Sequence, residues 1–279
     1  MNAVVSQRNG IIKQAHTSMS IDAITIDFWN TLVDSTGGPA RRAARNAAIR
    51  EAFDDIGAEF DEAAVREAFE VSYAEFERRW YGEQRTMDAS ACMQVMWEHL
   101  GVRMPEKQHR RVTEAVEDSI LAGMPALLPG VEQVLPRLAQ RYRLALISDT
   151  AMSPGRVLRQ VLERHGVASY FRGMVFSDVT GVSKPHPLAY ATALRLVEAD
   201  AARAVHIGDI ERTDIAGAVD AGMRAVLFRG DPTGRYHGEQ QSENTRAHAV
   251  AHDWFEIESI INDWDADGAS ATMTKGQEA

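Results

Sequence analysis

The sequence predicts an α/β fold, a Rossmann-like, doubly wound parallel sheet with an inserted α-helical domain. From residue 125 onward, short apolar runs that end in polar residues alternate with amphipathic helical patterns. That alternation is typical of right-handed βαβ units, which build a parallel sheet. Another apolar run, at residues 22–27, is followed from about residue 38 to 124 by helical periodicity alone. The insertion therefore follows the first strand, so we expect it to cover the C-terminal edge of the sheet as a lid.

The first strand is the apolar run that stops at Asp27. After it, four apolar stripes with helical spacing predict four helices joined by short connections, which form a small bundle. The first helix is closed by Gly57, the second opens with Asp61 as its N-cap, the third ends at Gly101 and the fourth follows Pro105. The stripes are Ile49, Phe53 and Ile56; Val65, Phe69, Phe76 and Trp80; Cys92, Met96 and Leu100; and Val112, Val116 and Ile120.

The second half of the chain supplies the rest of the sheet. Its apolar runs predict strands, and the amphipathic patterns between them predict helices. The predicted strands are 144–148, 174–177, 204–209 and 225–228, and the predicted helices are about 155–164, 188–198 and 213–221.

These elements define the predicted domains. Residues 21–37 and 125–263 form the α/β core, and residues 38–124 form the inserted helical domain, called the cap below. Residues 1–20 and 264–279 lack apolar periodicity and are rich in small or polar residues, so both ends are predicted to be flexible tails.

Composition excludes several classes of protein. A chain of 279 residues that is 45% hydrophobic and 25% charged buries a core, as globular proteins do. The formal charge of −10, without a Lys/Arg cluster, predicts that nucleic acid is not a partner. No apolar run reaches the ~18 residues of a membrane span, and no signal peptide opens the chain, so we expect no membrane contact and a cytoplasmic location. The single cysteine, Cys92, is interpreted as a small buried hydrophobic residue.

Polar residues of different kinds come at the ends of the core strands. Asp27 follows the first strand, Ser148 ends the second, Lys184 comes after the third, and Asp209 ends the fourth, with Asp214 five residues on. Such residues converge at one edge of a parallel sheet. Carboxylates hold a hard cation such as Mg²⁺, while ammonium and hydroxyl groups bind phosphate oxygens. A remaining carboxylate is suited to attack as a nucleophile, so the sequence predicts phosphate chemistry.

From residue 22 to about 262 the chain resembles the haloacid dehalogenase superfamily, in particular its members with a helical cap between the first two motifs. Four motifs stand in the family's order. They are DFWNT at residues 27–31, LALISDT with Ser148, SKPHP with Lys184, and GDIERTD with Asp209 and Asp214.

The resemblance implies a nucleophile and a metal site. Asp27 would attack the electrophile and form an aspartyl intermediate, and its other oxygen would help to bind Mg²⁺. The backbone carbonyl of Trp29 and the carboxylate of Asp209 would be further ligands. Asp214 would hold the metal or its waters.

The resemblance also implies the phosphate-binding residues. Ser148 would donate a hydrogen bond to a phosphoryl oxygen, and Lys184 would neutralise charge on the nucleophile and the phosphate. Thr31 would sit beside the nucleophile in the turn.

Trp29 departs from the family pattern. Phosphatases of the family usually carry there a second Asp, which protonates the leaving group and then activates water, and an indole cannot do either. The Trp29 ring either lines the substrate pocket or packs under the cap. Asp149 and His186 are alternative proton carriers, although a surface turn acid and a helix-start histidine are the preferred interpretations. Arg41 and Arg42 either reach a substrate anion or, as preferred, are solvated helix charges.

The expected function is that of a Mg²⁺-dependent phosphohydrolase acting on a small phosphorylated metabolite, as a monomer or homodimer. Family dehalogenases form an ester on carbon and need no metal, so the presence of both Asp209 and Asp214 favours a phosphoryl substrate. Dehalogenases also lack the Asp that Trp29 replaces, as do members that cleave carbon–phosphorus bonds. A 2-haloacid dehalogenase, or a weakly active binding or regulatory member, therefore remains an alternative.

Overall fold

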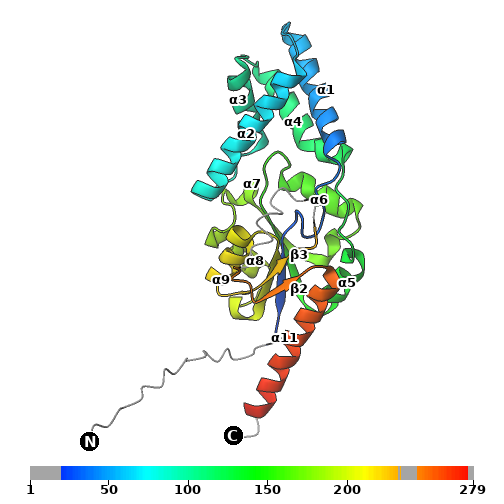
Figure 1. Cartoon of the computed structure of the whole chain (residues 1–279), viewed down its shortest axis with the longest axis vertical. Helices are drawn as coiled ribbons and strands as arrows, with labels where there is room; N and C mark the ends of the chain where they lie inside the picture. Colours follow the sequence, from blue (N-terminus) through cyan, green and yellow to red (C-terminus); the bar gives the residue numbers. More distant parts are fainter. Residues whose placement is uncertain (1–19, 232, 234–243, 276–279) are drawn as a thin grey trace, which may run out of the picture.

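The computed structural model describes residues 20–231, 233 and 244–275. Within these residues, a six-stranded sheet in the order β3-β2-β1-β4-β5-β6 lies at the centre, with every neighbouring pair parallel (Figure 1). The predicted fold class is thereby confirmed. The strands are β1 (Ala23–Ile26), β2 (Arg143–Ser148), β3 (Phe171–Phe176), β4 (Ala204–Gly208), β5 (Arg224–Phe228) and β6 (Ala249–Ala251).

β1 lies in the middle of the sheet and is completely buried. Its Ile26 is opposite Leu146 on β2 and Ile207 on β4. The winding of the sheet changes direction here, because β2 and β4 lie on opposite sides of β1. In open α/β sheets, ligands bind at the carboxyl ends of the strands beside such a switch point.

Helices cover both faces of the sheet, and successive residues of a strand contribute to opposite faces. Ile24 and Ile26 of β1 pack in one hydrophobic cluster with α5, α6 and α11. Ala23 packs with small residues such as Ala145 and Ala225 in a second cluster, which contains α8 and α9. The helices concerned are α5 (Val131–Arg141), α6 (Gly155–Arg164), α8 (Pro187–Leu196), α9 (Ala216–Asp220) and α11 (Trp254–Lys275).

The four helices predicted between the first two strands are present, and they lie above the carboxyl edge of the sheet (Figure 1). α1 packs on α4 and α2 on α3 around a separate hydrophobic cluster, in which Cys92 is buried. Burial raises the pKa of the Cys92 thiol to about 12. Asp61 caps α2 as predicted, accepting a hydrogen bond from Ala63 N at 2.8 Å. The helices are α1 (Gly38–Ile56), α2 (Glu62–Glu83), α3 (Ala89–Leu100) and α4 (Glu106–Ala122).

Two connections join these helices to the sheet, and they touch one another. Gly37 has a φ of +82°, and a Cβ atom built there would lie 2.2 Å from the carbonyl oxygen of Gly123. Both positions therefore require glycine. Two loop residues of the sheet, Met152 and Ile210, also join the hydrophobic cluster of the four helices.

Two predicted elements differ from the structure, and other elements were not predicted. β3 ends at Phe176, because Ser177 begins the short helix α7 (Ser177–Thr180) and its hydroxyl accepts a hydrogen bond from Thr150 N. The helix predicted at 213–221 begins earlier as a π-helix, Glu211–Ile215, and continues as α9. The helices α5 and α11 and the edge strand β6 were not predicted.

Residues 264–275, which were predicted to belong to a flexible C-terminal tail, continue α11. Asp265 fixes this part of the helix to the core, since its carboxylate accepts hydrogen bonds from Ile21 N at 3.2 Å and from Tyr142 Oη at 3.1 Å. The predicted N-terminal tail, except Ser20, and residues 276–279 lie outside the described residues.

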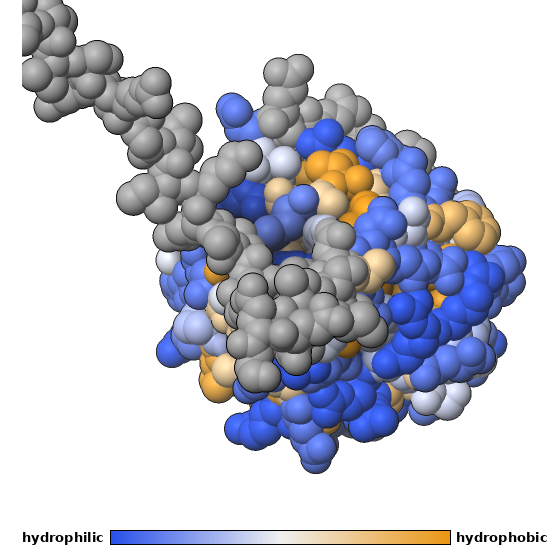
Figure 2. Space-filling view, turned by 90° about the horizontal axis from the view of Figure 1, so that it is seen from below, coloured by the Kyte–Doolittle hydropathy of each residue, from blue (hydrophilic) through white to orange (hydrophobic). Residues whose placement is uncertain are grey.

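The end of the molecule opposite the four helices has a mainly hydrophilic described surface, with hydrophobic residues in small separate groups (Figure 2). Among the described helices, none combines the length with the apolar character that crossing a membrane requires.

Candidate active site

Asp27 stands at the carboxyl end of β1 and is 6% exposed. Its N–H still donates to Ile207 O of β4 at 2.9 Å, so the sheet holds its backbone in place. The chain then turns back tightly, and Leu32 N and Val33 N both donate to Phe28 O at 3.1 Å. The buried Phe28 ring anchors this turn in the core. Asp27 is therefore presented at the switch point on a rigid support.

A buried ammonium group joins two of the predicted carboxylates. Lys184 Nζ donates to Asp27 Oδ1 in a short hydrogen bond and to Asp214 Oδ1 at 2.6 Å. Oxygens of Asp27, Asp209 and Asp214 all lie within 4.8 Å of one another. None of these four side chains is appreciably exposed. Three carboxylates against one ammonium leave the cluster with an excess of acid, a set of oxygen donors suited to a hard cation.

Burial and mutual charge shift the pKa values of this cluster. Burial raises the pKa of Asp27 to about 7, with the Lys184 charge opposing the shift and the Asp214 charge adding to it. Burial acts against the charged form of Lys184, but the charges of Asp214 and Asp27 outweigh it and hold its pKa well above the usual value. For Asp214, Lys184 and His206 outweigh burial and keep the pKa below its usual range. Lys184 and Asp214 are therefore a charged pair, and Asp27 is the carboxyl group that titrates near neutral pH.

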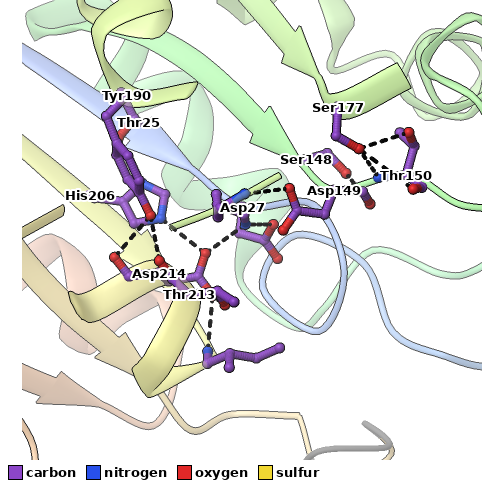
Figure 3. Close-up of polar contacts among 12 residues, drawn as sticks. Thr25, Asp27, Ser148, Asp149, Thr150, Ser177, Tyr190, His206, Thr213 and Asp214 are labelled. Atoms are coloured by element: carbon purple, nitrogen blue, oxygen red, sulfur yellow. Dashed lines mark hydrogen bonds and ion pairs between the residues drawn. The ribbon is translucent and has the colours of Figure 1, made fainter. Parts of the chain in front are cut away.

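His206, which was not among the predicted site residues, lies next to Asp214 and helps to hold it in place (Figure 3). Its Nε2 lies 3.1 Å from Asp214 Oδ1, and its Nδ1 lies 2.7 Å from Thr25 Oγ1. Burial lowers the pKa of this fully buried imidazole, so it is neutral. Since the ionised Asp214 only accepts hydrogen bonds, Nε2 carries the proton and Nδ1 accepts from the Thr25 hydroxyl. The only signal in the sequence was a histidine inside the apolar strand AVHIG.

Three further features complete the support of Asp214. Ile210 N donates to Asp214 Oδ2 at 3.0 Å, and Tyr190 Oη donates to Thr213 O at 2.6 Å. A Cβ atom on Gly208 would lie 2.4 Å from the Asp214 carboxyl carbon, so only glycine at the end of β4 lets the carboxylate pack there. Asp214 is thus held in one orientation, toward Lys184.

A cavity of about 260 Å³ opens between this cluster and the four helices. The core contributes carboxylates and the ammonium group, and the helices contribute one basic and several aromatic side chains. The lining includes Asp27, Trp29, Asp149, Lys184, Asp209 and Asp214 from the core, and Arg45, Tyr73, Phe76 and Trp80 from the helices.

Trp29 both lines the cavity and packs, so neither predicted role excludes the other. Its ring meets the Phe28 ring edge-on, with centroids 5.1 Å apart. The Arg41 guanidinium lies over the Trp29 ring at 5.6 Å from its centroid. Arg41 also donates to Ser35 O at 3.0 Å and is only partly exposed, so the preferred prediction of a solvated charge is wrong for Arg41. Arg42 is exposed, as that interpretation expects.

Two predicted phosphate-binding residues lie beside the cavity and do not line it. Ser148 is buried at the end of β2, with its Oγ 3.4 Å from Asp149 O. Thr31 is fully buried, and its Oγ1 has no hydrogen-bond partner among the described residues. Its carbonyl oxygen accepts from Trp254 Nε1 at 2.9 Å, which ties the turn to α11.

The preferred interpretation of Asp149 as a surface turn acid is wrong. Its Oδ1 accepts from Lys184 N, and its Oδ2 accepts from Trp80 Nε1 of α2, both at 2.9 Å. Burial raises the pKa of Asp149 to about 6, and Lys184 limits the shift. His186, by contrast, caps α8 by accepting from Leu188 N at 3.2 Å, and it does not line the cavity.

Comparisons with known proteins agree with this geometry. Residues 21–222 match the family model described as haloacid dehalogenase-like hydrolase. A glyceraldehyde 3-phosphate phosphatase of Pyrococcus abyssi is 37% identical over 103 residues, which are 37% of this chain and 42% of that protein. The chain thus spans less than half the length of that relative. A phosphoglycolate phosphatase of Pseudomonas fluorescens is 24% identical over 205 residues, 72% of each chain.

Solved structures share the fold. The crystal structure of a 2-haloacid dehalogenase from Pseudomonas syringae pv. Tomato superposes with a TM-score of 0.62 at 23% identity. The superposition covers 88% of this chain and 99% of that chain. At this identity the likeness concerns the arrangement of the backbone and says nothing about the reaction.

Proposed function

Because the chain belongs to the haloacid dehalogenase-like hydrolases, we propose that it removes the phosphoryl group from a small phosphorylated metabolite, with Mg²⁺ and through an aspartyl-phosphate on Asp27. Membership of that family makes the chain a hydrolase. The observation that carries the finer proposal is the buried cluster in which Asp27, Asp209 and Asp214 approach one another around Lys184. Relatives named as phosphatases of two small phosphoesters support the substrate class.

The donor set fits a divalent cation. Three buried carboxylates lie close together, and the Lys184 ammonium group pairs with two of them, Asp27 and Asp214. Charges buried without compensation cost several kcal/mol each. Asp27, Asp209 and the Trp29 carbonyl would hold Mg²⁺, and Asp214 would hold the metal or its waters. The cation would offset negative charge where phosphate oxygens gather. A metal-free dehalogenase has no need for this excess of acid.

The protein's own residues divide the work of the reaction. Lys184 binds Oδ1 of Asp27, and Oδ2 accepts no hydrogen bond from a described residue, which leaves one oxygen to attack. In the first step, a bond forms between Asp27 and phosphorus while the ester P–O bond breaks. In the second, water attacks phosphorus and regenerates the carboxylate. Lys184 neutralises charge in both steps, and Ser148 reaches a phosphoryl oxygen by rotating its side chain.

Asp149 replaces the missing acid at Trp29 in this proposal. Of the two alternative carriers, Asp149 lines the cavity beside Lys184, and His186 does not. A pKa of about 6 lets Asp149 hold a proton for the leaving oxygen and take one from water. Trp29 keeps the backbone carbonyl and closes the cavity.

Asp149→Asn is expected to slow hydrolysis of alkyl phosphates by about 10²-fold, the scale of general acid–base catalysis, and to affect aryl phosphates much less. An aryl leaving group departs without a proton, so the missing acid matters little. The measurement is kcat/KM for matched alkyl and aryl phosphates. Trp80→Phe is the control, because it removes the hydrogen bond to Asp149 and keeps the carboxylate. Equal losses on both substrates, or the same pattern in Trp80→Phe, would assign Asp149 a structural role.

Trp29→Asp should restore part of the alkyl-phosphate activity of Asp149→Asn.

A phosphate-release screen of small phosphoesters tests the proposal as a whole. EDTA is expected to abolish release and Mg²⁺ to restore it, because the carboxylates repel the phosphate without the cation. Asp209→Ala should raise the Mg²⁺ concentration that is needed, or prevent rescue. Chloride release from a 2-haloacid in EDTA would select the dehalogenase instead. Mg²⁺ binding without turnover of any phosphoester would select the regulatory alternative.

The helical insertion is part of the proposal as well. We take residues 38–124 as a cap and residues 21–37 and 125–263 as the catalytic core, acting in the cytoplasm. The separate hydrophobic cluster of the four helices supports this division, and so does the contact between the two connections at Gly37 and Gly123. The cap would exclude water from the cavity while phosphoryl transfer takes place.

A further inference from the structure

A second cavity, of about 430 Å³, adjoins the first on the side of α1 and α2. The two share part of their walls, so a ligand with its phosphoryl group at Asp27 can extend from one into the other. The shared lining residues are Trp29, Arg45, Tyr73, Met152 and Ser153.

The two cavities have opposite charge. Carboxylates dominate the first, whereas four arginines line the second together with the two acids Glu62 and Glu70. The arginines are Arg41, Arg42, Arg45 and Arg66. A substrate that bridges the two spaces therefore meets a basic environment at the end that leaves with the ester oxygen.

Arg45 stands out within this basic group because it lines both cavities. Its Nε donates to Ser119 Oγ at 2.8 Å, and the Ser119 hydroxyl in turn donates to Val116 O at 2.6 Å. The Phe69 ring lies under the guanidinium, with the centroid at 5.8 Å. These contacts from α4 and α2 hold a side chain of α1 in one orientation.

The charge of Arg45 has no acidic partner among the described residues, since its polar contact is the neutral Ser119 hydroxyl. Burial lowers its pKa to about 10, which leaves it charged at neutral pH. No described residue accepts a hydrogen bond from its two Nη atoms, and the residue lines both cavities. A half-buried, oriented guanidinium with an open fork of donors matches a carboxylate or phosphate group.

We propose that Arg45 binds a second anionic group on the substrate, so that the preferred substrates are small phosphomonoesters whose leaving group carries a carboxylate or a second phosphate. This inference rests on the proposed function, because it assumes that the phosphoryl group lies at Asp27. Arg41 adds positive charge nearby, but its guanidinium is engaged with Ser35 O, Thr36 O and the Trp29 ring. Arg45 is therefore the specificity-determining contact.

Binding to the Asp27→Asn variant with Mg²⁺ tests the inference by titration calorimetry, because this variant keeps the cavity and cannot turn over. One pair of ligands is 2-phosphoglycolate and 2-hydroxyethyl phosphate, which differ in a carboxylate. A second pair is propane-1,3-diyl bisphosphate and 3-hydroxypropyl phosphate, which differ in a phosphate. The doubly anionic member of at least one pair should bind about 10- to 100-fold more tightly, the range for hydrogen bonds to charged groups. The pair that shows the preference identifies the anion.

Arg45→Met in the same background should remove that preference while changing the affinity for the hydroxyalkyl phosphates less than about threefold, since only the distal contact is lost. Arg45→Lys should retain part of it. Arg110→Met, which removes an exposed arginine of α4 paired with Glu106, should leave it intact and controls for the net charge. Equal affinities within both pairs, or a preference that survives Arg45→Met, would overturn the inference, as would failure of all four ligands to bind.

Turnover of the wild-type protein separates this inference from the proposed function. Phosphate release without an Arg45-dependent preference would support the proposed phosphohydrolase activity and contradict the role of Arg45 in substrate specificity. An Arg45-dependent binding preference without phosphate release from any ligand would support the role of Arg45 in binding and contradict the proposed phosphohydrolase activity.

Discussion

Asp27→Asn is expected to abolish phosphate release and to leave the melting temperature in EDTA unchanged or slightly raised. The amide has the shape of the carboxyl group but cannot form an acyl phosphate, so the first covalent step is lost. Phosphate release and thermal melts of the same preparation test both parts. Activity above a few per cent of the wild type, after mass spectrometry has excluded deamidation, would mean that another group attacks.

The stability part of this expectation follows from the pKa of Asp27. Its folded value of about 7 lies above the ordinary 3.8, and this already includes the attraction of Lys184. The protonated carboxyl group thus contributes stability that is complete below pH 3.8 and is lost as the pH rises through about 7. Asparagine has no such dependence. Between pH 6 and pH 8 in EDTA, the melting temperature of the variant should therefore rise relative to that of the wild type. A melting temperature that instead falls further below the wild-type value over this range would contradict this expectation.

Lys184→Met is expected to lower kcat/KM by about 10²-fold or more, and also to destabilise the fold by about 3 kcal/mol. The substitution removes the one ammonium group that, among the described residues, contacts Asp27 and Asp214, and it leaves both carboxyl groups buried. Unlike Asp27→Asn, this change should therefore be visible in urea unfolding as well as in kinetics.

The pH dependence of Lys184→Met has a definite sign. Buried carboxyl groups without a cation avoid their charge by taking up protons, so the deficit in unfolding free energy should shrink at pH 5 and grow at pH 8. Lys107→Met, which removes an exposed lysine of α4, is the matched control. It should change neither kcat/KM nor the free energy of unfolding. A deficit of the same size at both pH values would contradict the role given to Lys184 in the acidic cluster.

The sequence was sufficient to predict five of the six described strands and the residues at the carboxyl edge of the sheet. Asp27 and Asp209 follow mainly apolar runs, and in a parallel sheet the residues that end such runs meet at one edge. Helix ends could be predicted equally well, because Gly57 and Asp61 are local capping signals that do not depend on packing.

The residues that were missed, or predicted in the wrong environment, depend on contacts between distant elements. Asp149 is half-buried, and Trp80 Nε1 of α2 donates a hydrogen bond to it, so its surroundings depend on a distant helix. Arg45 of α1 lines the cavity because α1 packs above the edge of the sheet. His206 is polar on a face of β4 that is otherwise apolar, and its role is visible only once Thr25 and Asp214 stand on either side. Continuation of α11 beyond residue 263 likewise depends on the contacts of Asp265, because the sequence that follows it is rich in small and polar residues.

The most direct test of the central claim is the mass of the Asp27 peptide after the wild-type protein is mixed with a hydrolysable phosphomonoester and Mg²⁺ and quenched in acid. We predict that this peptide gains the mass of one phosphoryl group during turnover. The gain should be absent in EDTA and in Asp27→Asn. Phosphate release by a wild-type protein whose Asp27 peptide never carries a phosphoryl group, or carries it on another residue, would contradict the assignment of Asp27 as the nucleophile.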